Sequence, residues 1–378
     1  MNVNERALIA FFQDLHRHPE LGGQETRTTE RIREALARAG VETLDPGLGT
    51  GAIARVRGKE PGRVIGLRAD MDALPLQEET GLPYASQRQG VMHACGHDFH
   101  TACMLGAALL LKEKEETLRG TVKIVFQPAE EISDGGEKMM QSGLLDDVQE
   151  FYAAHTYPAF PAGTLGIKEG PVMAAPDAFT IRILGEGAHG GNPHQGVDPI
   201  PAAAALVLSA QTLISRRKDA FEPAVLSVTH LDAGSTWNVV PPSALIEGTL
   251  RTLDEELRQE TVRRLNAMAE AVAAAHGCRA DVTWMMGPPP VVNDTALCAA
   301  ARKIASSLGF HVDRQANTMG GEDFSEYLKK APGVFIRVGT GGGYTNHHPR
   351  FTADPAALYP AARFFASLAL ERAAISTP

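Results

Sequence analysis

The segment from Met92 to His100 reads Met-His-Ala-Cys-Gly-His-Asp-Phe-His and constrains the fold more than any other stretch. It places three imidazoles, one thiol and one carboxylate within nine residues, and it runs directly into an apolar sequence from Thr101 that predicts a helix. A thiolate and an imidazole two positions apart, here Cys95 and His97, can ligate the same metal ion. A single buried cysteine or histidine is more often only a core residue. So dense a cluster favours a metal site, which ligands from elsewhere in the chain must complete.

Further candidate ligands follow the apolar segments that predict β-strands. Strands are expected at residues 63–67, 121–126 and 151–154, and the side chains that follow them are Asp70 and Asp72, Glu130 and Glu131, and His155. Active sites of open α/β sheets gather at the carboxyl ends of the strands. We therefore expect these side chains to converge near Cys95 and His97, which we place on a loop between two strands.

Glu130 and Glu131 could be no more than solvated charges at a strand end. They stand just beyond an apolar strand, however, where an unpaired anion costs several kcal/mol that a metal ion would offset. Adjacent carboxylates also point to different sides, so one can bind metal while the other holds a water. His155, taken alone, is as consistent with a core histidine as with a ligand.

A glycine-rich segment near the C-terminus ends in His347 and His348. It lacks the lysine and the serine or threonine of a phosphate loop, which argues against a nucleotide site. A turn that presents a histidine ligand fits this segment better than a mobile surface loop. Glu322 and Asp323 could simply cap a helix.

The alternation of helices and strands favours an α/β fold. Between residues 177 and 290 the pattern reads strand, helix, strand, strand, helix, strand, which is the βαββαβ ferredoxin-like plan. We therefore expect two domains: one at residues 1–176 and 291–378, and one inserted into it at residues 177–290.

The chain has 378 residues, which is enough for two domains that each bury a core. Its net charge of −9 argues against binding to nucleic acid or to acidic membrane surfaces. No stretch approaches the ~18 consecutive apolar residues of a membrane span, and the N-terminal residues lack the apolar run of a signal peptide. Four cysteines without regular spacing favour a reducing compartment and no disulfides. The expected location is the cytoplasm.

Taken together, these motifs resemble the M20 metallopeptidases, and within them the amidohydrolase branch that includes N-acyl-amino-acid, hippurate and auxin-conjugate hydrolases. The matching segments follow one another in order over almost the whole chain: His18-Pro-Glu, Arg68-Ala-Asp-Met-Asp-Ala-Leu-Pro, His93-Ala-Cys-Gly-His-Asp, Gln127-Pro-Ala-Glu-Glu, His155, Gly187-Ala-His189, Asn238-Val-Val-Pro, Gly248-Thr-Leu-Arg, Gly321-Glu-Asp-Phe and His347-His-Pro-Arg-Phe. The resemblance implies a zinc-peptidase-like α/β/α catalytic domain with an inserted dimerisation or lid domain, and hence a homodimer.

The resemblance also implies two divalent metal ions bridged by Cys95. The implied partners are His97 and His155 at one ion and Glu131 and His347 at the other. His347 is preferred to His348 because the ligand of the family usually stands two residues before the proline. Zinc or manganese is expected, although cobalt or nickel could use the same ligands.

One position departs from the pattern of many M20 enzymes, which take a ligand histidine from a His-x-Asp motif. Here that position is Asp70, as in the amidohydrolase branch. His97 then becomes the substitute imidazole. Asp70 and Asp72 are expected to orient the ligands rather than to bind metal.

Glu130 would be the general base, taking a proton from a metal-bridging water and passing it to the leaving amine. His189 and Asn238 match residues of the insert that, in family dimers, reach the active site of the neighbouring protomer and could stabilise the oxyanion. Arg251 could bind a substrate carboxylate, although an arginine at a strand end is often only a surface charge.

The function expected from this resemblance is hydrolysis of an N-acylated amino acid to a carboxylic acid and a free amino acid. An exopeptidase or dipeptidase would use the same metals and base and differ only in its pocket. A catalytically silent metal-binding sensor of the same fold is the alternative from another class. A thiol redox protein built on Cys95 lacks a Cys-x-x-Cys partner.

Overall fold

The structure, a computed structural model, describes residues 4–314 and 317–375. The described residues form two compact units. Unit 1 comprises residues 4–170, 292–314 and 323–375, and unit 2 comprises residues 171–291 and 317–322. Residues 1–3, 315–316 and 376–378 of the expected catalytic domain lie outside the described residues.

Residues 171–176, 291 and 317–322 belong to unit 2, whereas the sequence-based division assigns them to the surrounding domain. The reason is backbone pairing within unit 2: Thr318 N donates to Val172 O at 3.2 Å, and Ala174 N donates to Gly320 O at 2.9 Å. Such pairing depends on residues far apart in the chain, so no local sequence pattern predicts it.

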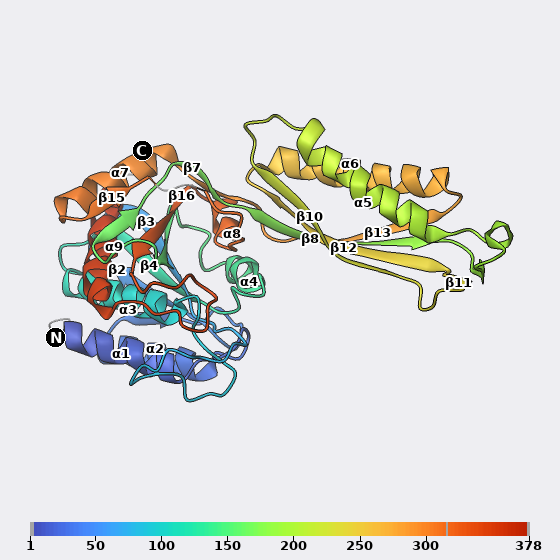
Figure 1. Ribbon diagram of the computed structural model, residues 1–378. Helices are drawn as coiled ribbons and strands as arrows, with labels where there is room; N and C mark the ends of the chain where they lie inside the picture. Colours follow the sequence, from blue (N-terminus) through green and yellow to red (C-terminus); the bar gives the residue numbers. More distant parts are fainter. Residues whose placement is uncertain (1–3, 315–316, 376–378) are drawn as a thin grey trace. The chain divides into compact units, whose positions relative to one another are not determined.

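The sheet of unit 1 has eight strands within the described residues, in the order β1-β2-β4-β3-β5-β16-β6-β15. Their bounds are β1 Glu42–Leu44, β2 Ala52–Arg57, β3 Glu60–Asp70, β4 Arg119–Gln127, β5 Glu150–Tyr157, β6 Thr164–Gly166, β15 His311–Asp313 and β16 Gly333–Gly339. The four neighbours β4, β3, β5 and β16 run parallel. Figure 1 labels three of them, β3, β4 and β16. The carboxyl ends of all four strands therefore meet at one edge of the sheet, where the site described below is formed.

The helices of unit 1 in the described chain are α1 Glu5–Arg17, α2 Thr26–Arg38, α3 His97–Glu113, α4 Gly135–Gln141, α7 Thr295–Ser307, α8 Ser325–Leu328 and α9 Leu358–Ala373, with a 3-10 turn, η2, at Pro355–Ala357. Helix α3 packs beside α9 and against β3, and α1 and α2 cover α3. Because it is enclosed on these sides, α3 is apolar around most of its surface, whereas α1 buries one stripe that includes Leu8, Phe12 and Leu15.

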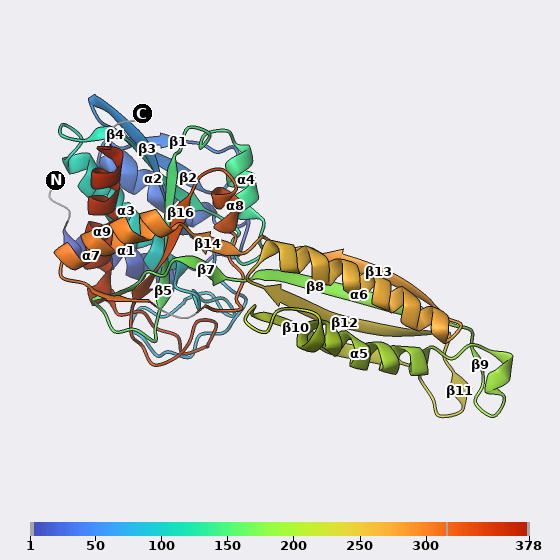
Figure 2. The same ribbon diagram turned by 90° about the horizontal axis from the view of Figure 1, so that it is seen from above.

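Unit 2 contains β8 Ala175–Leu184, α5 Pro199–Arg216, β10 Ala224–Ala233, β12 Ser243–Thr252, α6 Glu255–Ala275 and β13 Arg279–Met285. The strands pair antiparallel in the order β10-β12-β8-β13. Side chains of β12 alternate between buried and half-buried, and α5 and α6 lie together on one face of this sheet (Figure 2). Asp198 and Asp254 cap the two helices through their side chains.

The remaining elements are short: β7 Gly170–Met173, β9 Ala188–His189, β11 Val239–Val240, β14 Val291–Asn293 and a 3-10 turn, η1, at Pro193–Gln195. Two-stranded sheets pair β11 with β9 and β14 with β7. In residues 4–314 and 317–375, no helix combines the length and the apolar character needed to cross a membrane.

Candidate active site

Cys95 and His97 do not share a loop, because α3 begins at His97 rather than at Thr101. Gly96 takes the left-handed conformation, with φ of +84°, which is the reason the helix can begin there. A Cβ atom at this position would lie 2.7 Å from Cγ2 of Thr156. Glycine at position 96 therefore lets the thiol and the imidazole approach β5. The expectation of a loop for His97 was wrong because helix starts carry little sequence signal when no side chain caps them.

The donor atoms of five predicted ligands form two overlapping groups. One group contains Cys95, His97 and His155, the other Cys95, Glu131 and His347, and the donor atoms of each group lie within 4.8 Å of one another. Cys95 belongs to both groups. Its Sγ lies 3.4 Å from Nε2 of His155, and Nε2 of His347 lies 3.5 Å from Oε1 of Glu131. A sulfur shared by two such groups has the arrangement that a bridging thiolate requires.

Two buried donor atoms of these groups have no hydrogen-bond partner among the described residues, Nε2 of His97 and Oε1 of Glu131. Native proteins rarely leave buried polar atoms unpaired. Burial, followed by the charge of Glu131, also raises the pKa of the Cys95 thiol, so a bound cation is what would favour the thiolate here. The donor set of one thiolate, three imidazoles and one carboxylate suits a divalent transition-metal ion. The residues therefore fit two metal ions.

Neighbouring groups fix the orientation of the His97 and His155 imidazoles. Nδ1 of His97 lies 3.1 Å from Oδ1 of Asp72, and Nδ1 of His155 donates to the carbonyl of Thr156 at 2.9 Å. In each ring Nδ1 makes this hydrogen bond, so Nε2 is the nitrogen that faces the other candidate metal ligands. The sequence predicted that His155 follows the end of a strand, but His155 lies inside β5. The strand continues to Tyr157 because its parallel pairing with β16 extends as far as Gly339.

His347 and His348 differ sharply in their surroundings. His347 has φ of +66°, and its backbone N donates to the carbonyl of Ala94 at 2.8 Å. The ring of His348 instead stacks on Tyr344 at 4.4 Å between centroids, and its Nδ1 accepts from the backbone N of Arg350. Of the two histidines, only His347 is part of a donor group.

Glu130 and Glu131 lie in a sharp turn after β4. Ala129 is held at φ of +56°, a left-handed conformation that costs a non-glycine residue about 1–2 kcal/mol. The turn is closed by a hydrogen bond of 2.7 Å from Ser133 N to Glu130 O. The Glu130 carboxylate, whose side chain is 11% exposed, comes within 3.9 Å of Nε2 of His97. It therefore stands beside the donor groups, although it belongs to neither of the two that share Cys95.

Asp70 is fully buried in a polar network behind the donor groups. Its Oδ2 accepts from Nη1 of Arg68 at 2.7 Å, and its Oδ1 lies 2.6 Å from Nδ1 of His100. Nε2 of His100 accepts from the backbone N of Thr156, so Nδ1 of His100 is the protonated nitrogen and donates to Asp70. Burial raises the pKa of Asp70, but the interactions with His97, His100 and Arg68 outweigh it and hold the pKa well below its usual value.

The sequence interpretation missed several members of this network. Arg68 also donates to Gln127 and to Asp323, the latter at 2.7 Å. Asp323 therefore belongs to this network, and it does not cap α8, whose N-cap residue is Phe324 and which has no side-chain cap. Burial raises the pKa of Asp323 to about 6, against the lowering effect of Arg68. His100 could have been found from its place three residues after His97, because that spacing puts both rings on one face of a helix. The Arg68–Asp323 pair joins residues too distant in sequence for any local signal.

The predicted residues of the insert lie in unit 2, whereas both donor groups lie in unit 1. His189 and Asn238 are neighbours within unit 2: Gly190 N donates to Asn238 O at 2.8 Å, and His189 pairs with Val239 between β9 and β11. His189 is exposed and Asn238 is half-buried. Arg251, near the end of β12, is half-buried, and its Nε donates to the hydroxyl of Thr249 at 3.0 Å.

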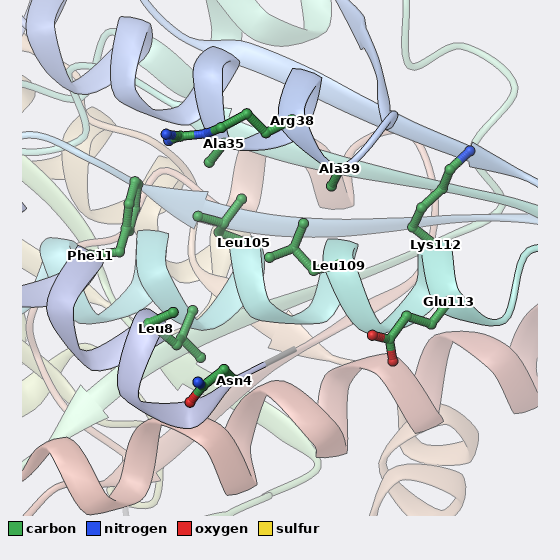
Figure 3. Close-up of a pocket in the computed structure, with 11 residues that line it drawn as sticks. Asn4, Leu8, Phe11, Ala35, Arg38, Ala39, Leu105, Leu109, Lys112 and Glu113 are labelled. Atoms are coloured by element: carbon green, nitrogen blue, oxygen red, sulfur yellow. The ribbon is translucent and has the colours of Figure 1, made fainter. Parts of the chain in front are cut away.

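A separate pocket of about 440 Å³ lies among α1, α2 and α3 (Figure 3). It is lined by Asn4, Ala7, Leu8, Phe11, Ala35, Arg38, Ala39, Leu105, Leu109, Lys112 and Glu113. Its α3 residues come from the second half of that helix, whereas His97 is the first residue. The pocket contains none of the predicted metal ligands and is not part of the site.

Comparison with known proteins shows the family of this chain. The family model described as peptidase family M20/M25/M40 matches residues 66–371, and the chain belongs to this family, as its motifs predicted. It is 46% identical over 364 residues to an N-acetylcysteine deacetylase of Bacillus subtilis, covering 96% of each chain. It is also 35% identical to thermostable carboxypeptidase 1 of Saccharolobus solfataricus, covering 96% of this chain and 95% of that protein.

A solved structure has the same α/β fold. The Bacillus subtilis YXEP protein, described as a dinuclear metal-binding peptidase from the M20 family, matches with a TM-score of 0.89 and 43% identity, over 98% of each chain.

Proposed function

We propose that this chain is a metal-dependent amidohydrolase that cleaves N-acyl amino acids to a carboxylic acid and a free amino acid. The observation that carries the proposal is the pair of donor groups that share Cys95, with the Glu130 carboxylate beside them. The dinuclear metal site named for the similar solved structure supports two ions per chain. The activity named for the relative that is 46% identical supports N-acyl amino acids as substrates.

His97, His155 and Cys95 would hold one ion, and Glu131, His347 and Cys95 the other. When bound, the two ions would lower the pKa of a water molecule and polarise the carbonyl of the scissile amide. The thiolate and imidazole ligands favour zinc, while manganese, cobalt and nickel remain compatible with the same set. Asp70 and Asp72 would orient the ligands.

Glu130 would act as the general base and then as the general acid. Its carboxylate takes a proton from the attacking water, whose oxygen forms the new bond to the acyl carbon. The carboxyl group then delivers that proton to the amide nitrogen as the carbon–nitrogen bond breaks. Proton transfers of this kind contribute roughly 10²–10⁴-fold to the rate.

Unit 1 would be the catalytic domain, and unit 2 would be an inserted domain of ferredoxin-like plan that serves dimerisation or forms a lid. The strand order β10-β12-β8-β13 with two helices on one face supports that plan. In a homodimer, His189 and Asn238 would donate hydrogen bonds to the oxyanion at the site of the partner protomer. Arg251 would bind the substrate carboxylate through its guanidinium group.

A panel of N-acetyl amino acids, N-benzoyl amino acids and dipeptides tests this function. The protein is assayed as purified, after chelation and after metal is added back. Release of an amino acid from the acylated substrates, lost on chelation and restored by metal, is the expected result. Cleavage of dipeptides alone would favour the peptidase alternative. The similarity to a carboxypeptidase is the observation that supports this alternative. No cleavage of any substrate by metal-loaded protein would contradict the proposal.

A further inference from the structure

Glu25 stands behind the turn that carries Glu130, and the proposed function gives it no role. It is the N-cap residue of α2, but its side chain does not cap that helix. The side chain is fully buried, and its Oε1 accepts a hydrogen bond of 2.8 Å from the backbone N of Ala129. A buried carboxylate carries a large desolvation cost, so its use of this backbone N–H as a partner fixes the position of the turn.

The turn needs such a restraint because of its own conformation. Ala129 has φ of +56°, which a residue with a Cβ atom adopts only when its surroundings hold it there. The chain before Glu25 contributes to this enclosure, since a Cβ atom on Gly22 would lie 3.3 Å from Cα of Ala129 and 3.2 Å from Oδ2 of Asp72. The segment from Gly22 to Glu25 thus packs directly against the turn.

The two carboxylates in the turn are held by different partners. Glu131, the proposed ligand, has its backbone N bonded to Oδ2 of Asp72 at 3.0 Å. Glu130, the proposed base, follows Ala129 directly, and the bond from Glu25 acts one residue before it. The restraint by Glu25 therefore bears mainly on Glu130, while Asp72 holds Glu131.

We propose that Glu25 is a positioning residue that holds the Ala129 turn in its left-handed conformation and so sets the place of the general base Glu130. This inference rests on the function proposed above, since it concerns the same reaction. A misplacement of about 1 Å at a reacting group can lower the rate roughly 100-fold. Loss of the bond should therefore reduce kcat and leave KM and bound metal nearly unchanged.

Three substitutions at position 25 test the proposal. Glu25→Met keeps the length of the side chain but removes the acceptor, Glu25→Asp keeps the carboxylate but shortens its reach by about 1.5 Å, and Glu25→Gln keeps both the length and an acceptor oxygen. We expect kcat to fall roughly 10- to 100-fold in Glu25→Met and Glu25→Asp. Glu25→Gln should stay within threefold of the wild type, with about the same number of metal ions per chain in every variant.

Thr28→Val is the matched control. Thr28 is buried in the same helix, and its hydroxyl donates to Oε2 of Glu20 at 2.9 Å, away from the turn. This variant should lower the melting temperature of the protein without changing kcat. The proposal is overturned if Thr28→Val loses as much kcat as Glu25→Asp, if Glu25→Gln is as slow as Glu25→Asp, or if the loss of activity follows a loss of bound metal.

A crystal structure of Glu25→Asp separates this inference from the proposed function. We expect residue 129 to leave the left-handed region and the Glu130 carboxylate to move, whatever the substrate of the wild type proves to be. An unchanged turn in that crystal structure overturns the role of Glu25 even if the hydrolase activity is established. A displaced turn supports it even if the substrate panel fails.

Discussion

The carboxylate of Asp72 connects His97 to Glu131, one residue from each of the two donor groups. Its Oδ1 lies 3.1 Å from Nδ1 of His97, and its Oδ2 accepts from the backbone N of Glu131 at 3.0 Å. The His97 ring N–H and the Glu131 backbone N–H are both hydrogen-bond donors, so both oxygens of Asp72 act as hydrogen-bond acceptors. A single carboxylate therefore fixes the orientation of the His97 ring and the position of the Glu131 backbone.

Asp72→Asn should weaken metal binding, because an amide offers only one acceptor oxygen to two donors. Its NH₂ group would face either the His97 ring N–H or the Glu131 N–H, and one of these would lose its partner. Loss of such orienting partners typically lowers metal affinity 10- to 100-fold. Metal titration of the apo protein measures this effect. Asp45→Asn, at an exposed carboxylate, is the control and should bind metal like the wild type.

His347 and His348 provide a matched pair, because they are adjacent and only one lies in a donor group. His347→Ala should lose one of the two metal ions and most of the activity, since a ligand is removed. His348→Ala removes only the ring that stacks on Tyr344 and should keep both ions. Metal analysis of the two purified variants decides the assignment, and the reverse result would move the ligand to His348.

Glu150 should make the stability of unit 1 depend on pH. It is buried and accepts hydrogen bonds from Arg372, Tyr152 and Arg63. Burial raises the pKa of Glu150, but these bonds, that from Arg372 first, outweigh it and leave the pKa below its usual value. A carboxyl group with a lowered pKa in the folded state stabilises the protein fully above its unfolded pKa, about 4.3. That contribution is lost as the pH falls through the folded pKa.

Glu150→Gln should therefore destabilise the protein by roughly 1.5–3 kcal/mol at pH 7, the range for hydrogen bonds to charged groups. The difference from the wild type should shrink as the pH falls below about 4. Denaturant unfolding at several pH values measures it. Glu42→Gln is the control, because the Glu42–Arg55 pair is exposed and such pairs contribute only about 0–1 kcal/mol. A difference for Glu150→Gln that does not vary with pH would contradict this account.

Local patterns indicated which segments carry candidate metal ligands, whereas the choice of Glu131 and of His347 as ligands came from the family resemblance. Cys95 and His97 stand in one short motif, and Glu131 and His155 accompany apolar strands whose period is easy to recognise. In unit 2, the expected order of strand, helix, strand, strand, helix, strand is that of the main elements β8, α5, β10, β12, α6 and β13, and Asp198 and Asp254 are the N-caps of the two helices. Side-chain capping and regular alternation are short-range effects, so a sequence reports them well.

Features that depend on distant segments were not found. The bond between Arg68 and Asp323 spans 255 positions, and residues 317–322 join unit 2 through backbone pairs rather than through any pattern of their own. The left-handed turn at Ala129 could not be predicted from the sequence either, because alanine ordinarily avoids that conformation. It is held by Glu25, from a segment about a hundred residues earlier.

The most direct test of the central claim compares metal content and turnover in Glu130→Gln and Cys95→Ser with the wild type, on the best substrate of the panel. Glu130→Gln should retain two metal ions per chain while kcat falls roughly 10²–10⁴-fold, since only the proton transfer is lost. Cys95→Ser should lose bound metal as well as activity, whereas Cys103→Ala, at a buried thiol outside both donor groups, should keep its metal. Full turnover in Glu130→Gln, or two ions retained at wild-type affinity in Cys95→Ser, would contradict the account.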